Sequence, residues 1–214
     1  MSEAPFRVAI TVDVEFPDRP TETGVTARIL DALGAADVTA SMFLQGRWAE
    51  AVPALARRIA DEGHLIGNHS HHHARMTILT GAGITRDVLA ADRAISDATG
   101  RSPAPWFRCP FGAGAGTRRV VDRLAAAGYV DVGWDVDGLD WAGASATRLA
   151  GRLVRGTTRH GDGAVVLLHG WPASTPVALG QAIPRLRDAG ATFVTIDQLP
   201  HLPGRRSEEL VAAR

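Results

Sequence analysis

The sequence FRVAITVDVE (residues 6–15) opens a pattern of alternating strands and helices. Its β-branched, apolar residues predict a buried strand over residues 6–14. The run ends in Asp13 and Glu15, two positions apart, a spacing that puts both carboxylates of a strand on one face. Acids at a strand end are often only solvated, so this pair by itself leaves a structural and a catalytic interpretation open.

Strand-like and helix-like segments alternate along the rest of the chain. Six further extended segments are predicted, at residues 38–44, 64–67, 103–107, 129–134, 164–168 and 192–196. Six amphipathic segments lie between them, at residues 24–36, 48–62, 80–99, 117–127, 145–158 and 176–189. About seven such units predict an α/β fold of parallel strands, as a barrel or a doubly wound sheet. A full eightfold barrel needs roughly 250 residues, so 214 residues suit a shortened (β/α) barrel.

Composition narrows the classes of partner. The chain has 23 basic and 23 acidic residues, so no net field attracts nucleic acid or an anionic membrane. Its single cysteine, Cys109, excludes an internal disulfide. We find neither a secretory signal at the start nor a run of roughly 20 apolar residues, and therefore expect a cytoplasmic protein. The sequence does not indicate an oligomeric state.

Polar side chains recur where predicted strands end. Asp13 and Glu15 close the first strand, and later strands are followed by residues 69–73, Arg108 and Asp140, or end in His169. In barrels and in doubly wound sheets the chemistry gathers beyond the carboxyl ends of the strands. We therefore expect these groups to meet at one rim.

Residues 69–73 hold four of the eight histidines. In a helix, His69 and His73 would leave the same face and could hold one metal ion. Two histidines, one carboxylate and a water form a hydrolytic zinc arrangement, in which the water is acidified toward about pH 7. Zinc, cobalt, nickel or iron would suit such ligands. The alternative is a polar, solvated loop.

Arg108 and His169 each allow two interpretations. An arginine after a strand, fixed by the nearby Pro110, can hold a carboxylate bidentately, although a surface arginine is equally simple. A histidine ending an apolar strand is often a satisfied core residue. If Asp140 orients its ring, His169 can instead serve as a general acid.

Four motifs in order resemble those of the polysaccharide deacetylases of carbohydrate esterase family four. They are His69-Ser70 through His73, Arg108 with Pro110-Phe111, Asp137 with Asp140-Trp141, and Leu167-Leu168-His169. The resemblance runs from Val8 to about Leu199 and implies a distorted, shortened (β/α) barrel with about seven parallel strands. We accordingly assign a catalytic domain to residues 1–201. Residues 202–214 are expected, from their composition, to form a polar tail. Members of the family remove N- or O-acetyl groups from sugars.

The first motif departs from the family pattern. The family usually reads Thr-Phe-Asp-Asp-Gly, whereas this chain reads Thr11-Val12-Asp13-Val14-Glu15. Val14 cannot bind a metal, and strand alternation offers Glu15 in its place. This variant resembles a side branch that includes allantoinase-like amidohydrolases, some of which work without metal.

The resemblance assigns the base and the metal ligands. Asp13 would deprotonate a water bound to one divalent metal ion, and Arg108 would hold the Asp13 carboxylate. Glu15, His69 and His73 would bind the ion, with zinc preferred over cobalt, nickel or iron.

It also assigns the acid and the substrate contacts. His169, steered by Asp140, would protonate the departing amine, and the Phe111 backbone N–H would stabilise the oxyanion. Trp141 and Trp171 flank the motifs. Large aromatic side chains often pack in a core, but indole faces also stack on sugar rings, and we expect these two to contact the sugar.

Three functions remain open at this stage. The first is a metal-dependent hydrolase that removes the acetyl group of an N-acetylated sugar or small glycoside, acting on an amide bond that is not a peptide bond. The second is an amidohydrolase or esterase for a ureide, cyclic imide, formamide or acetyl ester, with or without metal. The third is a binding module without activity, against which the joint presence of Asp13, Arg108 and His169 argues.

Overall fold

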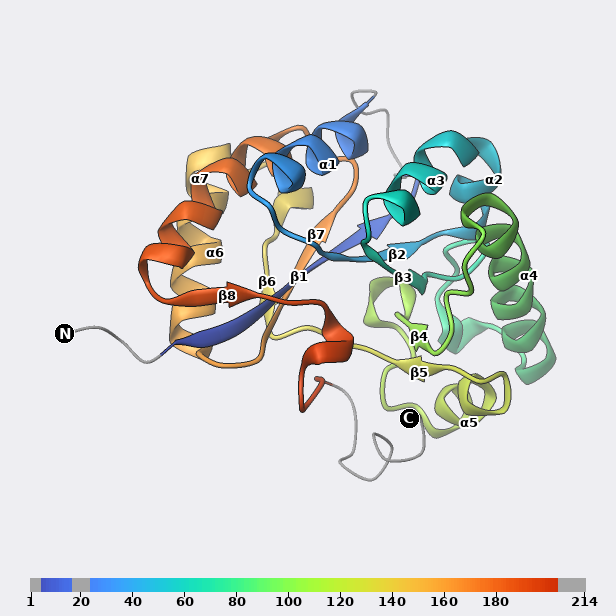
Figure 1. The fold of residues 1–214 in the computed structure, drawn as a ribbon. Coiled ribbons are helices and arrows are strands. Elements are labelled where there is room, and N and C mark those ends of the chain that lie inside the picture. Colours follow the sequence, from blue (N-terminus) through green and yellow to red (C-terminus); the bar gives the residue numbers. More distant parts are fainter. Residues whose placement is uncertain (1–4, 17–23, 204–214) are drawn as a thin grey trace. The chain divides into compact units, whose positions relative to one another are not determined.

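The computed structural model describes residues 5–16 and 24–203 of the 214-residue chain (Figure 1). The chain divides into two compact units. The first unit comprises Met1–Ser41 and Trp134–Pro200, and the second comprises Met42–Gly133 and His201–Arg214.

The first unit is built around a parallel sheet. Its elements are β1 (Phe6–Val14), α1 (Val25–Ala35), β6 (Val136–Asp137), the 3₁₀ turn η3 (Asp140–Ala142), α6 (Ala146–His160), β7 (Ala164–His169), α7 (Ser174–Asp188), β8 (Ala191–Phe193) and the 3₁₀ turn η4 (Ile196–Gln198). β1 pairs with β7 and with β8, and β6 pairs with the other edge of β7. All of β1 except Arg7 is buried, as expected of a parallel strand covered on both faces. Helix α7 packs against both α1 and α6 (Figure 1).

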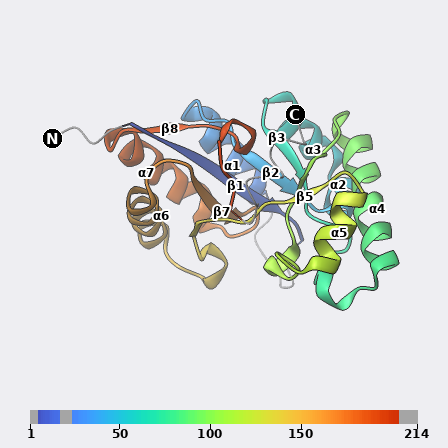
Figure 2. The ribbon, with the colours of Figure 1, turned by 90° about the horizontal axis from the view of Figure 1, so that it is seen from below.

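The second unit holds the remaining elements. They are β2 (Ser41–Leu44, whose first residue belongs to the first unit), α2 (Gly46–Ala51), α3 (Pro53–Asp61), β3 (Leu65–Asn68), the 3₁₀ turn η1 (Met76–Ile78), α4 (Gly81–Thr99), β4 (Trp106–Phe107), the 3₁₀ turn η2 (Pro110–Gly112), α5 (Arg118–Ala126) and β5 (Val130–Asp131). β4 lies between β3 and β5 in the sheet. Helix α4 packs against α2, α3 and α5 (Figure 2).

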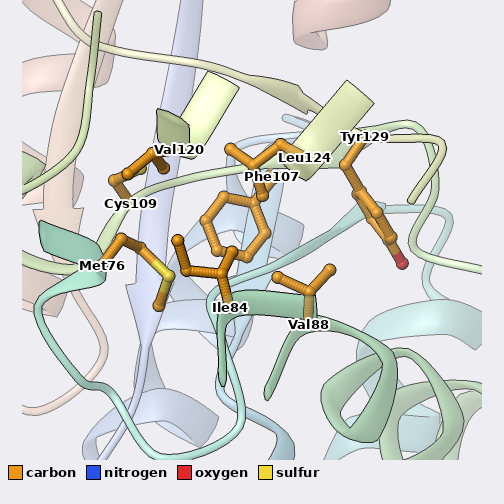
Figure 3. Close-up of a cluster of buried hydrophobic side chains, with 8 residues drawn as sticks. All are labelled: Met76, Ile84, Val88, Phe107, Cys109, Val120, Leu124 and Tyr129. Carbon is orange, nitrogen blue, oxygen red and sulfur yellow. The ribbon is translucent and has the colours of Figure 1, made fainter. Parts of the chain in front are cut away.

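Helix α4 shows how sequence fixes the ends of an element. Thr80 is its N-cap and accepts a hydrogen bond from the Gly83 N–H at 3.1 Å. Gly100 ends it with φ 73°, a left-handed conformation that glycine adopts without strain. Figure 3 shows the buried cluster to which α4 contributes: Met76, Ile84, Val88, Phe107, Cys109, Val120, Leu124 and Tyr129.

The predicted fold class is confirmed. Over residues 5–16 and 24–203 the chain is α/β, with seven parallel strands and the surrounding helices of a distorted, shortened (β/α) barrel, and with β8 besides. Among these residues, no helix combines the length and the apolar character needed to cross a bilayer.

Local departures from the predicted elements have identifiable causes. The helix expected over residues 48–62 is two helices, because Val52 leaves the helical conformation before Pro53, which begins α3. Strand β6 was not predicted, since two residues carry too little periodic signal. Of the predicted tail 202–214, Leu202 is buried and the Pro203 carbonyl accepts from the Gly133 N–H at 2.9 Å, while residues 204–214 lie outside the described residues.

Candidate active site

Asp13 and His169 end two neighbouring strands of the first unit. They are register partners across the parallel pairing of β1 and β7. The Gly170 N–H donates to the Asp13 carbonyl at 2.8 Å, which fixes the two strand ends against each other. The Asp13 side chain is buried. A carboxylate and an imidazole separated by 156 positions in sequence therefore share one edge of the sheet.

Asp140 orients the His169 ring. Its Oδ1 lies 2.8 Å from His169 Nδ1, and its Oδ2 accepts from the His169 backbone N–H at 2.8 Å. Oδ2 also accepts from the Thr175 hydroxyl at 2.8 Å. Because an ionised carboxylate only accepts, His169 Nδ1 carries the proton of this hydrogen bond. Nε2 is then the ring nitrogen that can exchange a proton with a substrate.

The electrostatic surroundings keep His169 protonated. Burial alone lowers the pKa of an imidazole, but the hydrogen bond to Asp140 and the Asp140 charge outweigh it and raise the pKa of His169 to about 9. The charges of Asp13 and Glu15 act in the same direction. At neutral pH this histidine is therefore a cation that can donate a proton.

Glu15 follows β1 and is buried. Its Oε1 accepts a hydrogen bond from the Trp171 Nε1–H at 3.3 Å. The Trp171 ring lies 6.0 Å from the His169 ring, measured between centroids. Trp171, predicted to contact substrate, thus also holds the carboxylate that was predicted to bind metal.

The histidine loop of the second unit is not helical, so the helical arrangement considered for His69 and His73 is wrong. Ser70 and His73 have φ values of 64° and 56°, which no α-helix contains. Asn68 Oδ1 accepts from the Ser70 N–H at 2.8 Å, and Ser70 Oγ accepts from the His73 N–H at 2.9 Å. These side chains replace the helical hydrogen bonds with a compact turn. The turn still brings the His69 and His73 rings together, 5.0 Å apart between centroids.

The His69 ring has the tautomer that a metal ligand needs. Its Nδ1 lies 3.0 Å from the Arg108 carbonyl oxygen, which can only accept, so Nδ1 is the protonated nitrogen. The lone pair of the neutral ring is then on Nε2. Metal-bound histidines in proteins commonly donate their second nitrogen to a carbonyl in this way. The paired imidazoles therefore fit a divalent ion such as zinc.

Helix α4 holds the histidine loop through Asp87, a buried residue that sequence reasoning missed. Its carboxylate accepts from the backbone N–H groups of His71 and His72, at 2.9 and 3.2 Å. It also lies 2.8 Å from His72 Nδ1. His71 and His72 are thus bound to α4, and their rings also contact each other, 4.5 Å apart between centroids. The His69 and His73 rings form a separate pair.

Arg108 is fully buried in the second unit. Its Nε and Nη2 groups donate to the carbonyl oxygens of Val132 and Gly133, both at 3.1 Å, and its guanidinium lies 4.1 Å over the Phe43 ring. The surface alternative for this arginine is therefore wrong. Asp13 and Arg108 belong to different units, so their predicted pairing stays a prediction.

The remaining site residues lie in turns. Phe111 has φ 58° within η2, its side chain is half exposed, and its ring lies 4.5 Å from the His73 ring. Trp141 is 42% exposed beside Asp140 in η3. Asp137 Oδ1 accepts from the Leu139 N–H at 2.8 Å and shapes the turn that leads to Asp140.

Known proteins show the same combination of sequence and fold. Residues 3–132, more than half of the chain, match the family model described as polysaccharide deacetylase. The chain is 32% identical over 193 residues to the peptidoglycan-N-acetylglucosamine deacetylase PgdA of Listeria monocytogenes, covering 90% of this chain and 38% of that protein. It therefore spans well under half the length of that relative.

Two further matches extend over most of this chain and most of the compared protein. The chain is 31% identical over 203 residues to the chitooligosaccharide deacetylase of Bradyrhizobium sp., covering 88% of this chain and 90% of that protein. A solved structure of a pseudoenzyme of the CE4 family from Bacillus anthracis shares 29% identity and a TM-score of 0.81 over 93% of this chain and 66% of that one. The motifs, the fold and these matches agree, and the chain belongs to the polysaccharide deacetylase family.

Proposed function

We propose that this protein is a hydrolase that removes the acetyl group from the amide nitrogen of an N-acetylated sugar. The observation that carries the proposal is the register pairing of Asp13 with His169, whose ring is oriented and charged by Asp140. Family membership and the named activities of the deacetylase relatives support it.

The two residues would divide the proton transfers. The Asp13 carboxylate would take the proton of the attacking water as general base. His169, protonated at neutral pH, would give its proton to the departing nitrogen, which otherwise leaves poorly as an anion. Arg108 would hold the Asp13 carboxylate ionised through charge-assisted hydrogen bonds.

Glu15, His69 and His73 would hold one divalent metal ion, zinc by preference. Such an ion polarises a carbonyl group and acidifies a water molecule. Trp171 would keep the Glu15 carboxylate oriented, and the Arg108 carbonyl would keep His69 in the required tautomer.

The substrate would meet the chain at Phe111, Trp141 and Trp171. The Phe111 backbone N–H would donate to the oxygen that becomes negative as the water attacks. The indole faces of Trp141 and Trp171 would stack on the apolar side of the sugar ring.

A second candidate function rests on the first motif. Val14 and Glu15 stand where the family usually has Asp and Gly, and this variant resembles the side branch that includes allantoinase-like amidohydrolases. The second candidate is therefore hydrolysis of a small amide or an ester, with or without metal. Because one similar structure is that of a pseudoenzyme, the experiment also tests a third outcome, binding without hydrolysis.

The experiment is metal analysis of the purified chain joined to substrate profiling. Acetate release would be followed on N-acetylglucosamine oligomers, simple amides, ureides and acetyl esters. Bound metal with acetate release from the oligomers is the expected result. Turnover only of the small amides or esters would establish the second candidate instead. Absence of all turnover by the metal-loaded chain would contradict both.

A further inference from the structure

Arg75 lies two positions after the metal-ligand candidate His73. The Phe111 ring contacts both side chains. The Arg75 guanidinium carbon lies 4.4 Å from the centroid of the Phe111 ring. The same ring also contacts His73, at 4.5 Å between centroids. His73, Phe111 and Arg75 are therefore three consecutive contacts within the second unit.

The Arg75 charge is exposed and has no carboxylate partner among residues 5–16 and 24–203. Other arginines of the chain are paired, such as Arg58 with Glu62 at 2.6 Å and Arg7 with Asp162 at 2.6 Å. A guanidinium over an aromatic ring is attracted by the ring face, while its N–H groups point along its own edges. The contact with Phe111 therefore positions the cation without using its hydrogen-bond donors.

We propose that Arg75 is a specificity-determining residue that binds a carboxylate carried by the substrate, on the sugar whose acetyl group is removed or on its neighbour. This inference rests on the proposed function, because it takes the acetylated amide to lie near His73. A planar guanidinium offers paired donors that match the two oxygens of a carboxylate. The substrate class is accordingly an N-acetylated sugar that is also an acid.

A purely structural role makes a different prediction. If the contact between Arg75 and Phe111 only steadied the loop, removing the charge would lower the thermal midpoint but would not change which ligand is preferred. If Arg75 binds a carboxylate of the ligand, removing its charge should change the preference for an acid over the corresponding uncharged ester. Exposed ion pairs are weak, so the expected preference for the acid is small. It corresponds to about a three- to fivefold difference in Kd between the acid and the ester.

The test uses N-acetylmuramic acid and its methyl ester, which differ in one negative charge. Calorimetry on the metal-loaded full chain would compare their Kd values for the wild type, Arg75→Gln, Arg75→Lys and Arg118→Gln. Arg118 is a matched control, since its side chain is 94% exposed on α5 and loses the same charge. Thermal midpoints of all four proteins would report any loss of folding.

We expect the wild type and Arg118→Gln to prefer the acid about three- to fivefold, and Arg75→Gln to show no preference. Arg75→Lys, which keeps the charge but not the paired donors, should show a reduced preference. Raising the salt concentration should weaken the preference of the wild type.

Equal affinity of the wild type for acid and ester, a preference retained in Arg75→Gln, or no binding of either ligand would each overturn the inference. Acetate release is a separate readout. A charge preference without acetate release would contradict the proposed function and leave the role of Arg75 standing. Acetate release without a charge preference would support the proposed function and contradict the role of Arg75.

Discussion

His169 is mostly buried and yet holds a proton, because Asp140 supplies both a hydrogen bond and a negative charge. Its pKa of about 9 lies above the ordinary value of 6.5. The active, protonated form should therefore persist at neutral pH and be lost as the pH rises through 9. The raised pKa of His169 also links folding to pH. The interaction of His169 with Asp140 stabilises the folded chain fully below pH 6.5, and this stabilisation is lost as the pH rises through 9.

Asp140→Asn tests this dependence. Removing the carboxylate charge should lower the pKa of His169, so the alkaline fall of kcat/KM should begin at a lower pH than in the wild type. The pH profile of kcat/KM measures the shift. Asp188→Asn, an exposed substitution at the end of α7, should leave the profile unchanged. An unchanged alkaline limb in Asp140→Asn would remove Asp140 from the proposed role.

Two roles are proposed for Trp171, and matched variants distinguish them. Trp171→Phe keeps an aromatic face and loses the N–H that donates to Glu15, so metal affinity should fall by roughly tenfold. Trp171→Ala also removes the ring and should raise KM more than it lowers kcat. Metal titration and steady-state kinetics measure the two effects. Wild-type metal affinity in Trp171→Phe would exclude the positioning role.

At the scale of elements, the first strand and most of the helices were the most predictable parts of the chain, whereas β2, β4 and β5 are shorter than their predicted segments. β1 follows the predicted run residue for residue, because β-branched residues fill its buried faces. β3 is shifted by one residue from its predicted segment, and β7 extends one residue beyond its own. The histidine loop was not predictable in the same way. Its shape depends on side chains of Asn68 and Ser70 that hydrogen-bond to the backbone, which a count of residue spacing does not register.

Helix α4 supports the histidine loop through Asp87, which gives an element-scale prediction. Asp87→Ala removes the acceptor of the His71 and His72 N–H groups, and should lower metal affinity by roughly tenfold or more. It should also cost about 1–3 kcal/mol of stability, because two partly buried N–H donors lose their acceptor. Isothermal metal titration and denaturant unfolding measure the two quantities.

Asp97→Ala is the control for that variant, being an exposed acid ten positions further along the same helix. It should bind metal as the wild type does. Equal metal affinities in Asp87→Ala and Asp97→Ala would show that the loop holds its shape without α4.

At the scale of the whole molecule, the sequence predicted that polar side chains gather at the strand ends, but not which of these side chains contact one another. The motifs identified Asp13, Asp140 and His169, and strand order then implied a common edge, as the register of β1 with β7 shows. The contact of Trp171 with Glu15 joins residues 156 positions apart and follows from side-chain packing, which periodicity does not encode. Arg108 was predicted to hold a carboxylate, but its hydrogen bonds to the Val132 and Gly133 carbonyls, which follow β5, were not predicted.

Metal binding should stabilise the whole chain. Glu15 lies in the first unit, and His69 and His73 lie in the second. At a metal concentration of about 100 times Kd, binding should add about 2.7 kcal/mol. For a chain of this length that raises Tm by roughly 5–10 °C.

Substitutions in either unit test whether the ligands act together. Glu15→Gln and His69→Ala should each abolish the metal-dependent rise in Tm, whereas His160→Ala, an exposed histidine at the end of α6, should keep it. Differential scanning calorimetry with and without zinc measures the increment. A full increment in either ligand variant would exclude that residue from the metal site.

Turnover of N-acetylglucosamine oligomers by purified, metal-loaded Asp13→Asn and His169→Ala addresses the acid–base pair itself. Acetate release per molecule of folded protein should fall by about 10²-fold or more in each variant relative to the wild type. Near-normal acetate release by either folded variant would contradict the assignment of Asp13 and His169 as base and acid.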